Sequence, residues 1–193
     1  MKILLIIVSA LILVLGCASR KPSKHEVQRP GISSIESRQS PRTSAYQQLT
    51  RRLQHETRAG QVQINQFGEG VKIIISNDIL FPVGHWKIHK GGEEVLDKII
   101  PVVKAHEIQA LEVCGFTDNK PVDPGLKERF SSNWELSGAR AIDVVMYMEK
   151  KGVNPDIISA TGYGDERPIA SNDTPAGRRK NQRVEIIAMF SDS

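Results

Sequence analysis

The pattern of apolar residues over positions 61–193 is the feature that most constrains the fold. Segments in which apolar and polar residues alternate, as in strands, take turns with segments in which apolar residues recur every three or four positions, as in helices. Elements that alternate in this way pack as layers around one core. The pattern therefore predicts an α/β (α+β) sandwich, with a mixed β-sheet and helices packed on one of its faces.

The expected elements can be placed along the chain. The clearest is a helix over 134–152, which Ser132 or Asn133 would cap and Gly152 would end. Its apolar positions, expected mostly on one side, are Leu136, Ala139, Ile142, Val145, Met146 and Met148. A hairpin is expected over 61–76, with its turn at 68–70. The remaining expected elements are a short helix over 45–60, a helix over 91–106 that contains Pro101, a strand over 110–116, and strands over 156–164 and 182–190.

Positive charge is concentrated ahead of this region. Residues 18–60 hold nine basic and three acidic residues, whereas residues 61–193 hold 16 basic and 19 acidic residues. A nucleic-acid-binding body would carry an excess of basic side chains, so we expect no nucleic-acid partner. Residues 18–44 are poor in large apolar side chains, and residues 18–60 are therefore interpreted as a flexible basic tether that ends in the short helix.

The first 17 residues end in a cysteine that follows an apolar run. This run, residues 3–16, is short for a transmembrane helix but suits a signal peptide. Residues 14–17 resemble a bacterial lipobox, which implies a lipoprotein signal peptide over 1–17 and lipidation of Cys17, including palmitate. Ala18, in place of Asp, then implies anchoring in the outer membrane with the domain in the periplasm. An uncleaved signal anchor is the alternative.

Cysteines and histidines offer little sign of catalysis. If Cys17 is acylated, Cys114 has no partner for a disulfide. Cys114 lies in an apolar run, which favours a small buried side chain over a nucleophile. His85 and His89 are spaced like metal ligands on a helix, but no third ligand is evident, so surface imidazoles are favoured. We expect no enzyme activity, no metal site and no cofactor.

Several stretches, together and in order, resemble the OmpA-like C-terminal, peptidoglycan-binding domain family. They are LFPVG (80–84), GFTDNKPV (115–122), NWELSGARA (133–141) and ISATGYGDERPIASNDTPAGRRKNQRVEI (158–186). The resemblance covers residues 61–193, which we interpret as the domain. It implies the predicted fold and non-covalent binding to the stem peptide of peptidoglycan.

The resemblance also implies the binding residues. In the family, the Asp of the Thr-Asp turn and the Arg of the Leu-Ser-x-x-Arg motif hold the ammonium and carboxylate of diaminopimelate. By position these residues are Asp118 and Arg140, with Leu136, Asn133 and Phe81 as lesser candidates. The chemistry agrees, because a planar guanidinium suits a carboxylate and a carboxylate suits an ammonium. Taken singly, Asp118 could instead be a turn residue and Arg140 a solvated helix residue.

The chain departs from the family pattern at several points. Phe116 stands where His is common, Gln182 stands where Arg is common, and the gap from Asp118 to Arg140 is longer than in many members. The segment 131–141 resembles the flagellar-stator version, but no acidic residue interrupts residues 3–16, so a motor role is not expected.

The expected function is therefore an outer-membrane lipoprotein that tethers membrane to cell wall, with peptidoglycan and the membrane as partners. The alternative is an envelope component of a type IVB-like secretion system, with the proteins of that complex as partners.

Overall fold

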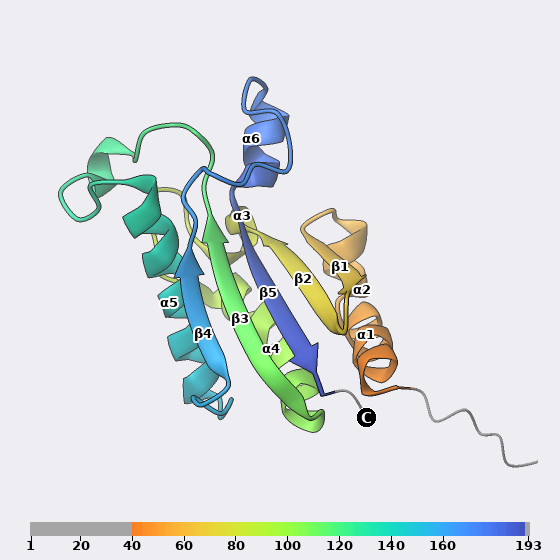
Figure 1. Ribbon diagram of the computed structural model, residues 1–193. Helices are drawn as coiled ribbons and strands as arrows, with labels where there is room; N and C mark the ends of the chain where they lie inside the picture. Colours follow the sequence, from red (N-terminus) through yellow and green to blue (C-terminus); the bar gives the residue numbers. More distant parts are fainter. Residues whose placement is uncertain (1–39, 192–193) are drawn as a thin grey trace, which may run out of the picture. The chain divides into compact units, whose positions relative to one another are not determined.

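The computed structural model describes residues 40–191, which are coloured in Figure 1. They form a five-stranded sheet of order β1-β2-β5-β3-β4, in which β3 and β4 are parallel and all other neighbours are antiparallel. The elements are α1 (Pro41–Arg52), α2 (Gln54–Arg58), β1 (Val62–Phe67), β2 (Gly70–Ser76), α3 (Asn77–Leu80), α4 (Lys90–Ala105), β3 (Ile108–Phe116), η1 (Pro124–Leu126), α5 (Asn133–Lys150), β4 (Ile158–Gly162), α6 (Pro175–Asn181) and β5 (Arg183–Phe190).

A tight turn joins β1 to β2. Gly68 has a φ of 52°, in the left-handed region that glycine adopts without steric cost, and Val62 pairs with Ile75 further along the ladder. The hairpin and the position of its turn were predicted from the sequence, and both are confirmed.

The main core lies between one face of the sheet and the helices. In Figure 1, α4 and α5 lie behind the strands. Ile73, Leu111 and Ile186 of the sheet share one fully buried cluster with Leu96 and Ile99 of α4. Burial of this apolar surface is the main force that holds the layers together. The predicted fold, a mixed sheet with helices packed on one face, is confirmed.

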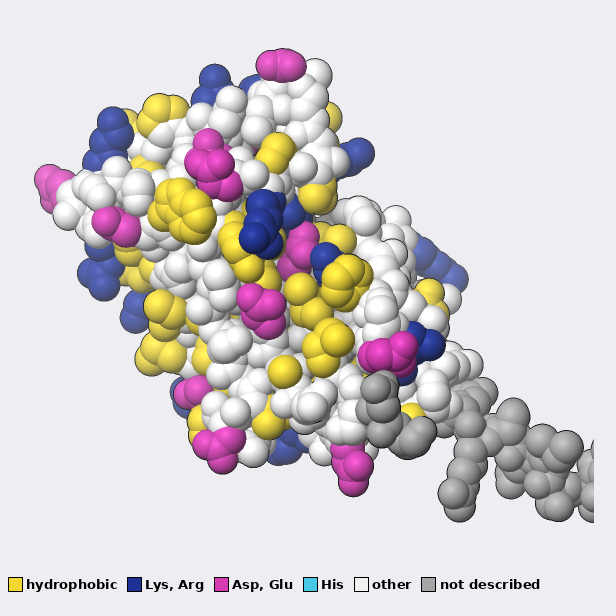
Figure 2. Space-filling view, in the orientation of Figure 1, with side chains coloured by type: hydrophobic (Ala, Val, Ile, Leu, Met, Phe, Trp, Pro, Cys, Tyr) yellow, Lys and Arg dark blue, Asp and Glu magenta, His cyan; other side chains and the backbone are white. Residues whose placement is uncertain are grey.

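The opposite face of the sheet is turned toward the viewer in Figure 2, where hydrophobic and charged side chains lie side by side. The Glu185 carboxylate accepts from Arg183 Nε at 2.7 Å and lies 3.0 Å from Lys72 Nζ. Because Glu185 is buried, these partners are needed to offset the cost of removing its charge from water.

The compact unit begins ahead of residue 61, where the sequence analysis placed the start of the domain. Within the described residues it already includes α1, because Ala45 and Leu49 of this helix, and Leu53 directly after it, belong to the main buried cluster. Glu56, also buried, accepts from Lys98 Nζ of α4 at 2.5 Å. The helices over 41–58 are therefore part of the packed structure. The proposed signal peptide and most of the proposed tether lie outside the described residues.

The buried face of α5 matches the predicted one only in part, because Leu136 and Met148 are buried as expected but two other predicted positions are not. Ile142 and Met146 are 51% and 61% exposed. The buried positions are Leu136, Ser137, Ala141, Val144 and Met148. Small residues occupy this face because the backbones approach closely: a Cβ added at Gly115 of β3 would stand 2.1 Å from the Ser137 carbonyl oxygen. An assignment based on hydrophobicity alone misses such a face.

Three short elements, α3, η1 and α6, were not predicted. The segments that contain them are rich in Asp, Asn, Pro and Gly and show no apolar periodicity. α6 begins where Thr174 Oγ1 accepts a hydrogen bond from the Gly177 amide. Across residues 40–191, no helix has both the length and the apolar character needed to cross a membrane.

The contribution of the α1–α2 segment to the core can be tested with Leu53→Ala, at the residue between the two helices, in a protein of residues 38–193. Leu53 is fully buried, so we expect the free energy of unfolding to fall by about 2–5 kcal/mol. Arg52→Ala, at the exposed neighbouring position, is the matched control, with an expected change below about 0.5 kcal/mol. Urea denaturation measures both. Equal stability of the two variants would show that this segment does not belong to the core.

Candidate functional site

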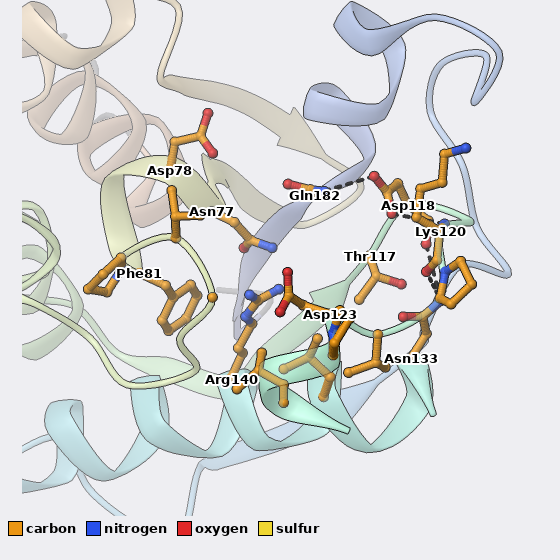
Figure 3. A pocket seen from close by; sticks show the side chains of 18 residues that line it. Asn77, Asp78, Phe81, Thr117, Asp118, Lys120, Asp123, Asn133, Arg140 and Gln182 are labelled. Carbon is orange, nitrogen blue, oxygen red and sulfur yellow. Dashed lines mark hydrogen bonds between the residues drawn. The ribbon is translucent and has the colours of Figure 1, made fainter. Parts of the chain in front are cut away.

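A pocket of about 620 Å³ brings the five predicted binding residues together. Figure 3 shows its side chains, which come from α3 and the loop after it, from the turn that follows β3, from η1, from the first half of α5, and from Gln182. The predicted residues that line it are Phe81, Asp118, Asn133, Leu136 and Arg140. We call this hollow the Asp118–Arg140 pocket.

The Asp118 carboxylate is held in place by two donors. Asp118 follows the end of β3 and is buried. Its Oδ1 accepts from the Lys120 amide at 3.0 Å, and its Oδ2 accepts from Gln182 Nε2 at 2.8 Å (Figure 3). The first bond is the local turn contact expected of Asp. The second fixes the carboxylate from another element. Both donors are neutral, so neither brings a counter-charge to Asp118.

Asn133 serves as a brace for the same turn. Its Nδ2 donates to the carbonyl oxygens of Asp118 at 3.3 Å and of Lys120 at 3.0 Å, and it lies 3.4 Å from Asp165 Oδ1. The Asn133 amide nitrogen thus donates to acceptors within the protein. Asn133 positions the Asp118 turn at the start of α5.

The N-terminus of α5 is capped by Ser132, one of the two predicted caps. Ser132 Oγ accepts from the Glu135 amide at 3.2 Å. The Glu135 carboxylate in turn accepts from the amide and the hydroxyl of Ser131, and these hydrogen bonds lower the pKa of Glu135. The carboxylate stabilises the positive end of the helix dipole.

Arg140 is half-buried on the same helix. Its Nη2 and Nε donate to the His85 carbonyl oxygen at 2.9 and 3.3 Å, and its guanidinium lies 5.3 Å from the centre of the Phe81 ring. Desolvation by burial lowers the pKa of Arg140 to about 10, and the charge of Asp118 acts in the opposite direction. Arg140 is therefore still cationic at neutral pH. Figure 3 shows its guanidinium directed into the cavity.

The long segment between Asp118 and α5 forms one wall of the pocket. Val122, Leu126 and Phe130 form a second small buried cluster with Leu136 of α5. Outside this cluster, Trp86 packs edge-on against Phe130, with ring centres 5.3 Å apart. The extra residues that make the 118–140 gap longer than usual thus have a structural role.

The structure adds residues that the sequence analysis did not single out. Asp78, Lys120 and Asp123 also line the pocket. So do Asn77 and Thr117, whose side-chain oxygens Oδ1 and Oγ1 are buried and have no hydrogen-bond partner within residues 40–191. Unpaired buried oxygens are uncommon, and they are found where a ligand or water completes the site. Thr117 belongs to the Thr-Asp turn of the family motif, and no sequence signal marks the other four residues.

Phe116 and Gln182, the two residues that depart from the family pattern, contact different parts of the structure. Gln182 gives Asp118 a neutral donor where a guanidinium is common. Phe116 stacks on Tyr163 with ring centres 5.2 Å apart, and the Arg183 guanidinium lies 3.8 Å from the centre of the Phe116 ring. A neutral ring suits this place, because a protonated His would repel Arg183.

The side chains of Cys114 and His89 lie outside this site, and His85 contributes to it only through its backbone carbonyl oxygen. Burial, with a smaller contribution from Glu112, raises the pKa of Cys114 to about 12, so its reactive thiolate is scarce at neutral pH. His89 caps α4 by accepting from the Gly91 amide at 3.0 Å. In the part of the chain that the structure describes, no three His, Cys, Asp or Glu side chains are grouped to hold a metal ion.

Comparison with known proteins agrees with the fold and the motifs. The model of the family described as "OmpA family" matches residues 80–182. Motility protein B of Bacillus subtilis (strain 168) is 32% identical over 130 residues, which cover 67% of this chain and 49% of that protein. Peptidoglycan-binding protein ArfA of Mycobacterium tuberculosis (strain CDC 1551 / Oshkosh) is 38% identical over 94 residues, or 49% of this chain and 27% of that protein.

A solved structure is also similar. The cell wall anchor of the T6SS from Pseudomonas aeruginosa has a TM-score of 0.68 at 27% identity, and the match covers 74% of this chain and 97% of that one. This chain spans about half of motility protein B and about a quarter of ArfA. The matches confirm the predicted resemblance, including its flagellar-stator-like version.

Proposed function

The chain belongs to the OmpA family, and we propose that its Asp118–Arg140 pocket binds peptidoglycan non-covalently, through the diaminopimelate of an uncrosslinked stem peptide. The observation that carries this proposal is the presence of one fixed carboxylate and one guanidinium in the same pocket. The free end of diaminopimelate carries an ammonium and a carboxylate on one carbon. Asp118 would accept from the ammonium, and Arg140 would donate to the carboxylate.

The pocket is suited to hold such a zwitterion without large rearrangement. The Asp118 carboxylate is held by Lys120 and Gln182, and the Arg140 guanidinium is held by the His85 carbonyl. Side chains that are already fixed lose little conformational entropy when a ligand binds. Phe81 and Leu136 supply apolar surface beside the charges, against which the methylene chain of diaminopimelate can pack.

The role of Arg140 is tested with Arg140→Ala. Loss of a hydrogen bond to a charged group costs about 1.5–3 kcal/mol, so we expect the dissociation constant for a diaminopimelate-containing muropeptide to rise roughly 10- to 150-fold. Isothermal calorimetry on residues 38–193 measures it, with Arg58→Ala, at an exposed site in α2, as the control. Unchanged affinity of Arg140→Ala would exclude the assigned role.

We further propose that the protein is an outer-membrane lipoprotein. Cys17 lies outside the described residues, and the proposal rests on its lipobox-like context. A lipid-anchored binder with its domain in the periplasm would tether the membrane to the cell wall.

Cys17→Ser tests the anchor. We expect the variant to lose lipidation and to move from the membrane fraction to the soluble fraction, because two or more acyl chains are needed for stable anchoring. Fractionation with acyl-chain labelling measures both effects. Retention of an unlabelled variant in the membrane would support an uncleaved signal anchor instead.

Similarity to the T6SS cell wall anchor favours a second candidate, in which wall binding positions a larger envelope complex. Affinity purification from envelopes after muramidase digestion separates the candidates. Defined protein partners that survive digestion are expected for the complex, whereas loss of all partners on digestion is expected for a plain wall tether.

A further inference from the structure

A second hollow, of about 340 Å³, lies beside the Asp118–Arg140 pocket. Asp78, the residue that follows Asn77 at the start of α3, lines both. In Figure 3 the Asp78 side chain is directed away from Arg140, at the rim of the pocket. The walls of the hollow include Gln61 and Ser76 from the β1–β2 side, and Arg179 and Lys180 from α6. We call it the Arg179–Lys180 hollow.

The two basic residues of this hollow are free to bind an anion. Arg179 and Lys180 are exposed, and within residues 40–191 neither makes an ion pair or a side-chain hydrogen bond. The nearby arginines already have partners within the protein. Arg178 Nη1 donates to the Asn172 carbonyl oxygen at 2.7 Å, and Arg183 is paired with Glu185. Positive charge at the hollow is therefore concentrated on two adjacent side chains.

Chain connectivity brings this charge close to the diaminopimelate-binding residues. Lys180 is two residues from Gln182, so their α-carbons are at most about 8 Å apart. Gln182 itself donates to Asp118 at 2.8 Å. One extended residue spans about 3.5 Å, so a peptide held in the pocket needs only a few residues of chain to reach the hollow.

We propose that the Arg179–Lys180 hollow is a second anion subsite, which takes the free α-carboxylate of the glutamate that precedes diaminopimelate in the stem peptide. The proposal rests on the proposed function. That glutamate is linked through its γ-carboxyl group, so its α-carboxylate stays free and charged unless it is amidated. Arg179 and Lys180 then discriminate stems in which the glutamate α-carboxylate is free from stems in which amidation has removed the charge of that carboxylate.

Two matched muropeptides test this subsite. Both contain diaminopimelate, and they differ only in whether the glutamate α-carboxylate is free or amidated. We expect the full-length protein to bind the free form about 1.4- to fivefold more tightly, the range for exposed ion pairs. Arg179→Gln with Lys180→Gln should remove this preference while leaving affinity for the amidated form unchanged.

The control is Arg51→Gln with Arg52→Gln, an exposed basic pair in the last turn of α1 with the same change in charge. It should keep the preference, which shows that net charge alone is not responsible. Equal binding of the two muropeptides to the wild type, or a preference that persists in the Arg179→Gln, Lys180→Gln variant, would overturn the subsite.

Failure of the proposed function gives a different result. In that case, neither muropeptide binds the wild type at all. A phosphate on a wall polymer offers the same charge as the glutamate, and inorganic phosphate is the probe for it. If phosphate weakens wild-type binding to isolated cell wall while the two muropeptides bind equally, the glutamate is the wrong anion and the proposal fails.

Discussion

The close packing of α5 on β3 and β4 is the constraint on which the candidate site depends. Asp118 follows β3 and Arg140 lies on α5, so the distance between the two layers sets the distance between the charges. Glycines allow that approach: a Cβ at Gly115 would stand 2.1 Å from the Ser137 carbonyl oxygen, and one at Gly162 would stand 2.5 Å from the Gly138 nitrogen. Ser137 Oγ also accepts from the Gly164 amide at 2.9 Å. Side chains at these places would push α5 away from the sheet and open the pocket.

The two charges of the site are fixed without being neutralised. Asp118 accepts from an amide nitrogen and a Gln side chain, and Arg140 donates to a carbonyl oxygen. These neutral partners offset part of the desolvation cost without supplying a counter-charge. A direct Asp118–Arg140 ion pair would have to be broken before a zwitterion could bind. The observed arrangement avoids that cost, and Gln182 contributes to it, since an Arg at the same position would pair with Asp118.

The sequence predicted the sheet, the hairpin and the long helices well, because their apolar periodicity is strong. It found Leu136 and Met148 on the buried face of α5 but missed the small residues there, since Ser137 and Ala141 pack by being small. The helix over 45–60 was predicted but its packing into the core was not, because a short helix with few apolar residues does not reveal what it packs against. Asp118 and Arg140 were identified through the family resemblance. The His85 carbonyl that holds Arg140 was not predictable, because every residue has a carbonyl and only the fold selects one.

The departure at Gln182 and the basic end of α6 form one electrostatic arrangement. Asp78, Asp118 and Asp123 outnumber Lys120 and Arg140 in the pocket, so its charge favours the ammonium of a ligand. Replacement of the common Arg by Gln182 removes a cation from this pocket. Two and three residues earlier in the chain, Lys180 and Arg179 add positive charge at the margin of the pocket. Negative charge within the pocket matches the ammonium of diaminopimelate. Positive charge beside the pocket matches the α-carboxylate of the glutamate, one residue away in the stem peptide. The proposed binding mode thus predicts selection for the orientation of the stem as well as for its composition.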